Sequence, residues 1–148
     1  MPQTTIERAY AALFDLASNA AKFVTFTRDI RQWSRIEGSP ASQPAIIQEQ
    51  GKIRFEAKPN IPTIIRLNAD LAILCNTSDA VKVPAPTLNA LVDAVLTALA
   101  PSPSDDYRQT LGGIVYDCKP MGDGFLREAT SASPQSYALI PIEIILTM

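Results

Sequence analysis

The chain has 148 residues, 47% of them hydrophobic, with 13 basic and 15 acidic residues and a formal net charge of -2. This length and composition suffice for one domain with a hydrophobic core, spanning residues 1–148. The lack of a basic excess argues against specific binding of nucleic acid, and the lack of histidine removes the commonest general base and metal ligand.

The N-terminus and the cysteines bear on where the chain is made. MPQTTIERAY has neither the charged region nor the apolar region of a signal peptide, and no apolar run approaches the ~20 residues that span a membrane. Cys75 and Cys118 lie 43 residues apart, and neither belongs to a CxxC pair. We therefore expect buried thiols in a reducing compartment and no membrane partner.

The first predicted elements are a helix and a strand. Thr4 and Glu7 form a capping box, and apolar residues at helical spacing follow, which predicts a helix over residues 5–19. Residues 23–28, "FVTFTR", alternate in polarity and are rich in β-formers, which predicts a strand.

The next stretch reads as a loop followed by strands. Residues 29–44 contain a glycine, two prolines and three serines, so we expect a long loop, and loops of this length are usually functional or disordered. Residues 45–57, "AIIQEQGKIRFEA", predict two short strands hinged near Gln50 and Gly51.

The middle of the chain predicts a long strand and a second helix. Along residues 63–77 one face is apolar throughout, while the other begins polar and turns apolar at Ala72, which indicates a strand covered on both faces at its end. Thr87 is placed to cap a helix that carries one leucine and valine stripe and stops at Pro101.

The last third predicts further strands. Residues 112–120 predict a strand, residues 121–135 a turn and a weak strand, and residues 137–146, "YALIPIEIIL", a strand that is apolar at nearly every position. Pro141 has no N–H and so requires a ladder gap, a bulge or an edge. The sum is an α+β fold: a mostly antiparallel sheet of five to seven strands with two amphipathic helices packed on one face.

No pattern of residues predicts catalysis. The glycines of "LGGI" and "MGDG" lack phosphate-loop spacing, and the acids of "SDD" lack the spacing of a calcium loop. Without histidine or a nucleophile elbow, a small Ser or Asp hydrolase is disfavoured. We expect no enzyme activity, no catalytic or metal-binding residue and no cofactor.

Residues 28–35, "RDIRQWSR", form the most unusual surface segment. Arg28, Arg31 and Arg35 flank the only tryptophan, Trp33, and Arg and Trp are enriched at interface hot spots. Three interpretations stay open: a protein interface, local packing of Trp33 with solvated arginines, and stacking on nucleic acid, which the flanking acids and a pI of about 5.1 disfavour.

The order of several motifs resembles one protein family. "QPAIIQEQ" at residues 43–50 is followed by "PTLNALVDAVLTALAP", "QTLGGIVYDCKPMGDGF" and "YALIPIEIIL". Together with the N-terminal amphipathic helix, this series resembles the tail terminator proteins of long-tailed, lambda-like bacteriophages (siphophages) over nearly the whole chain. "YDCKPMGDG" stands where similar proteins often carry Trp or His, a departure that touches no catalytic role because the family has none.

The resemblance implies a structural virion protein without a cofactor. Such a protein forms a hexameric ring of its own copies, caps the tail tube, stops tube polymerisation and presents a docking surface to the head–tail connector. DNA passes through the ring without specific binding. The implied location is the tail and neck of the virion, with the host cytoplasm during assembly.

The resemblance also suggests why the last strand is apolar on both faces. Its wholly apolar face packs against the subunit's own helices, and a neighbouring subunit covers the other, which makes Tyr137, Glu143 and Ile145 interface candidates beside the 28–35 segment. The alternative is a strand enclosed within one subunit. Other candidate functions are a head-completion or tail-completion neck protein and a monomeric adaptor.

Overall fold

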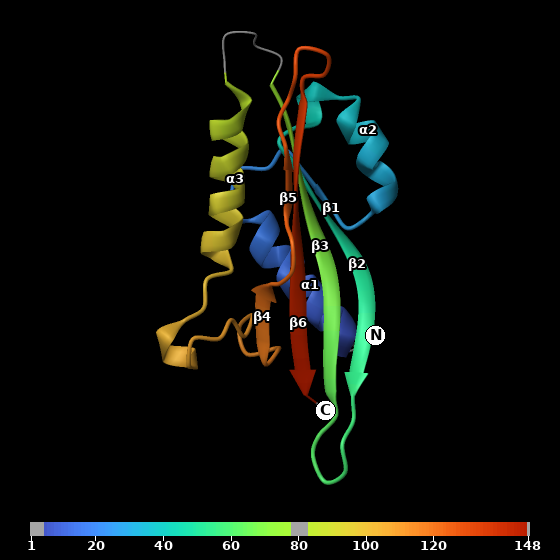
Figure 1. Cartoon of the computed structure of the whole chain (residues 1–148), viewed down its shortest axis with the longest axis vertical. Coiled ribbons are helices and arrows are strands. Elements are labelled where there is room, and N and C mark those ends of the chain that lie inside the picture. The colour runs from blue at the N-terminus through green and yellow to red at the C-terminus, as the bar shows by residue number, and fades with distance from the viewer. Residues whose placement is uncertain (1–4, 78–82, 148) are drawn as a thin grey trace.

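The computed structural model describes residues 5–77 and 83–147, which form an α+β fold around a six-stranded mixed sheet (Figure 1). The strand order is β1-β2-β3-β6-β4, and β5 also pairs with β6. β1 runs parallel to β2, and the other four pairings are antiparallel. The predicted fold class and range of strand number are confirmed. The strands are β1 (Thr25–Thr27), β2 (Ala45–Glu56), β3 (Ile64–Asn76), β4 (Asp117–Pro120), β5 (Phe125–Arg127) and β6 (Gln135–Thr147).

Three α-helices accompany this sheet. They are α1 (Thr5–Ser18), α2 (Trp33–Glu37) and α3 (Pro84–Ala98). α1 agrees with the predicted helix, although Thr4 of its expected capping box lies outside the described residues. α3 begins before the predicted cap at Thr87, because Pro84 and Pro86 occupy its first turn, where a missing N–H costs no intrahelical bond.

The prediction that residues 29–44 form a long loop was wrong. This segment instead folds into α2 between two 3-10 turns, η1 (Ile30–Gln32) and η2 (Pro40–Ser42). The Asp29 carboxylate accepts a hydrogen bond from the backbone N–H of Arg31 and so caps η1. Ile36 of α2 is fully buried, so the segment is ordered by tertiary packing that its loop-like composition does not indicate.

The predicted hinge in residues 45–57 was also wrong, because β2 is one continuous strand. Its register against β3 shifts between Gln50 and Ile53, so the chain accommodates Gly51 as a β-bulge rather than as a break. A Cβ at Gly51 would lie 3.3 Å from the Asn68 side chain and carbonyl, which explains glycine at this point. The bulge allows β2 to continue past the body of the sheet.

The main core lies on the face of the sheet that faces α1 and α3. Buried residues of both helices share one cluster with alternating residues of β3 and β6. The β6 members are those of the wholly apolar parity: Ala138, Ile140, Ile142, Ile144 and Leu146. The structure confirms that β3 is solvent-exposed on one face at its start and buried on both faces at its end.

A smaller core on the opposite face corrects the predicted helix arrangement. Ile36 of α2 forms a cluster with Ala45 and Ile47 of β2 and with Ala72 and Leu74 of β3. These strand residues alternate with those of the main core, so α2 covers the opposite face of the sheet. The sequence predicted only two helices, both on one face, and placed no helix on this second face.

β6 is enclosed within the sheet rather than at its edge. β3 pairs with it along its full length, while β4 and β5 pair with different parts of its other edge. The Pro141 carbonyl accepts a bond from the Met121 N–H, so the ring nitrogen also faces the connection between β4 and β5. The absent N–H of Pro141 thus falls in a gap of the ladder, as a proline in a central strand requires.

β4 is shorter than the predicted strand at residues 112–120. Leu111, Gly112 and Gly113 all have φ between 50° and 87°, so the "LGG" motif forms a turn instead of extended backbone. Only the end of the predicted segment pairs with β6.

Candidate interaction surfaces

Trp33 packs within the subunit. Its ring meets Tyr137 of β6 edge-on, with centroids 5.7 Å apart and planes at 77°, and its indole N–H donates to Glu37 at 2.9 Å. Both aromatic residues contact the small core beneath α2. Two interface candidates, 104 positions apart in the sequence, are thus brought together, and local packing accounts for the tryptophan.

The three arginines of the 28–35 segment each have a partner within the subunit. Arg28 forms an ion pair with Glu7 of α1 and donates to Gln50 of β2 at 3.0 Å. Arg35 donates to Gln32 at 2.6 Å. The Arg28 contacts tie β1 to the helix and to the neighbouring strand, which is a structural role.

Arg31 forms the most exposed of these contacts. Its guanidinium donates to both oxygens of the Asp29 carboxylate, at 2.8 and 3.0 Å. The Arg31 hydrogen bond lowers the pKa of Asp29 to about 2, so the pair persists over the physiological pH range. Because the Arg31 side chain is 86% exposed, this is a surface pair that a partner could also contact.

We expect Trp33→Ala to destabilise the isolated subunit by about 2 kcal/mol, because it removes the contact with Tyr137 and uncovers the cluster around Ile36. Arg31→Ala, the matched control on the same segment, should leave the unfolding midpoint almost unchanged. Chemical denaturation of both variants checks this expectation. Equal midpoints for Trp33→Ala and wild type would contradict the packing role.

Glu143 and Ile145, the remaining candidates, lie largely inside the subunit. Arg66 donates to the Glu143 carboxylate at 2.9 Å and to Glu56 at 2.7 Å, which links β6, β3 and β2 across the sheet. Glu143 is 8% exposed and Ile145 is 9% exposed. Neither residue therefore offers much surface to a partner.

The two cysteines are buried and form no disulfide. Burial, with a further contribution from the Asp117 carboxylate, raises the pKa of the Cys118 thiol to about 12. Such a thiol has almost no thiolate at neutral pH and is a poor nucleophile.

We expect a thiol reagent at pH 8 to leave Cys118 unmodified in the native protein and to modify it rapidly once denaturant unfolds the chain. Mass spectrometry of peptides locates the label, and Cys118→Ala serves as the control for its assignment. Modification of native Cys118 at the rate of a small free thiol would contradict its burial.

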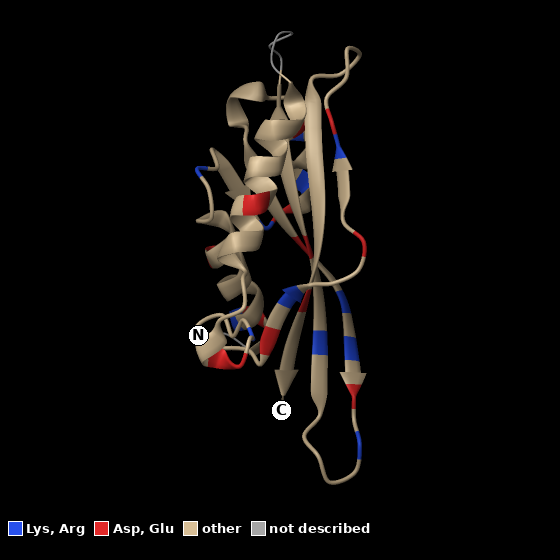
Figure 2. Cartoon of the chain, turned by 60° about the vertical axis from the view of Figure 1, so that its left-hand side comes forward, with Lys and Arg blue, Asp and Glu red and all other residues tan. Residues whose placement is uncertain are grey.

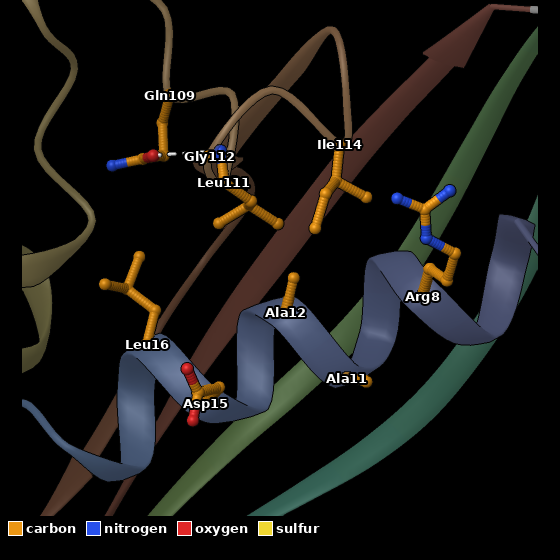
Figure 3. A pocket seen from close by; sticks show the side chains of 9 residues that line it. All are labelled: Arg8, Ala11, Ala12, Asp15, Leu16, Gln109, Leu111, Gly112 and Ile114. Atoms are coloured by element: carbon orange, nitrogen blue, oxygen red, sulfur yellow. Dashed lines mark hydrogen bonds between the residues drawn. The ribbon is translucent and has the colours of Figure 1, made fainter. Parts of the chain in front are cut away.

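A shallow pocket of about 440 Å³ lies between α1 and the turn before β4. Figure 3 shows Leu111 and Ile114 pointing from the turn toward Ala12 and Leu16 of the helix. The charged side chains of Arg8 and Asp15 come from separate turns of α1 (Figure 3). This arrangement fits packing of the turn on the helix and brings no reactive pair together.

The β2–β3 hairpin carries the first uncovered apolar surface. We call residues 51–63 the arm; Figure 1 shows it extending beyond the other elements at one end of the molecule. Phe55 is 64% exposed, Ile61 51% and Ile53 44%. Sequence reasoning placed a strand here but missed the surface, although basic residues alternating with apolar ones in "KIRF" were a signal for it.

The second uncovered surface is an apolar groove of about 380 Å³ between α3 and β5. Its lining includes Val92 and Leu96 of α3, Leu126 of β5 and Ile140 of β6. Leu126 is 55% exposed and Phe125 is 51% exposed. The ring centroid of Phe125 lies 5.7 Å from that of Tyr137. Phe125 pairs with Leu139 on the α2 side of the sheet, whereas Leu96, at 38% exposure, and Leu126 expose apolar side chains on the α3 side. Exposed apolar side chains that line a groove are typical of protein interaction sites.

The described residues contain no group of three or more His, Cys, Asp or Glu side chains that could hold a metal ion. Among the helices at residues 5–77 and 83–147, none is long and apolar enough to cross a bilayer. Comparisons of the chain with known protein families and with curated proteins find no match.

Proposed function

We propose that this chain is a structural assembly protein, the tail terminator of a long-tailed phage. In this proposal six copies form a ring that caps the tail tube, ends its polymerisation and receives the head–tail connector. The sequence resemblance supplies the family, and one structural observation supports a role in assembly. That observation is the presence of two separate uncovered apolar surfaces, the arm and the groove.

Two different surfaces on one subunit suit heterologous contacts. A two-fold dimer uses the same patch on both subunits, whereas a ring joins one patch of each subunit to a different patch of the next. In the proposed ring, α1 and α3 are the two amphipathic helices that cover one face of the sheet. The arm and the groove remain available to neighbours and to the tube.

A head-completion or tail-completion neck protein is the alternative, because it would also join like and unlike subunits at the head–tail interface. Disrupting the gene in the encoding phage distinguishes the two functions. Loss of a tail terminator should give tails of uncontrolled length in micrographs of lysates. Tails of normal length that fail to join heads would instead favour the neck protein, and normal infectious virions would contradict both functions.

A further inference from the structure

We draw no further inference here: the strongest candidate, the apolar groove between α3 and β5, is bordered by charges of both signs (Figure 2), and nothing among the described residues shows what covers either it or the exposed apolar side chains of the arm.

Discussion

Ending the chain after Leu139 should abolish folding of the soluble subunit. The deletion removes four residues of the main core, and each contributes about 1.5–3 kcal/mol when buried, or about 6–12 kcal/mol together. That sum rivals the total stability of a typical domain, about 5–15 kcal/mol. β3 and β4 also lose their partner strand over this length. The four residues are Ile140, Ile142, Ile144 and Leu146.

Ending the chain after Leu146 is the control for this truncation, since it keeps all four core residues. Circular dichroism and a thermal melt of both truncated proteins provide the measurement. The control should unfold cooperatively near the wild-type temperature, and the shorter chain should show no transition. A native-like transition in the shorter chain would mean that β6 is dispensable and would contradict its central place in the sheet.

A buried pair of amides should give the second largest effect. Gln43 and Gln135 donate to each other's carbonyl oxygens at 2.8 Å, and Gln43 also donates to the Ile36 carbonyl at 2.9 Å. The pair joins the end of η2 to the start of β6. Gln135→Leu should lower the free energy of unfolding by about 3 kcal/mol, because it leaves the buried side-chain carbonyl oxygen of Gln43 without its donor.

A double-mutant cycle separates this pairing from a simple change of volume. Gln43→Leu should cost a similar amount, while Gln43→Leu with Gln135→Leu should cost clearly less than the two losses added, because no orphaned amide remains. Urea denaturation of the four proteins gives the coupling energy. Additive losses would show that the two side chains do not act as a pair.

The sequence was most informative where a local pattern also determines the tertiary environment. The alternation in β3 and β6 marks the buried face because side chains of a strand alternate between two sides. The register between the two strands has no such local signal. The bulge at Gly51 is a similar case, since it depends on how closely Asn68 approaches. Strand existence was therefore predictable, and the continuity of β2 was not.

The interaction surfaces were less predictable because they depend on distant contacts. Trp33 and Tyr137 were each interface candidates, with local packing left open for Trp33, but only the fold places their rings against each other. Gln43 lay in an expected loop, and its partner is 92 positions away. Phe55 looks like a core residue in the alternating pattern, and it is exposed because the arm extends past the helices.

Electron microscopy of the purified full-length protein, at a concentration where light scattering detects oligomers, tests the ring assignment most directly. The proposed function predicts closed, uniform rings of six subunits, with a particle mass six times the 16.0 kDa of the chain. Two-fold dimers or open filaments would contradict it, as would a protein that is monomeric in solution and also shows no ring in assembled particles.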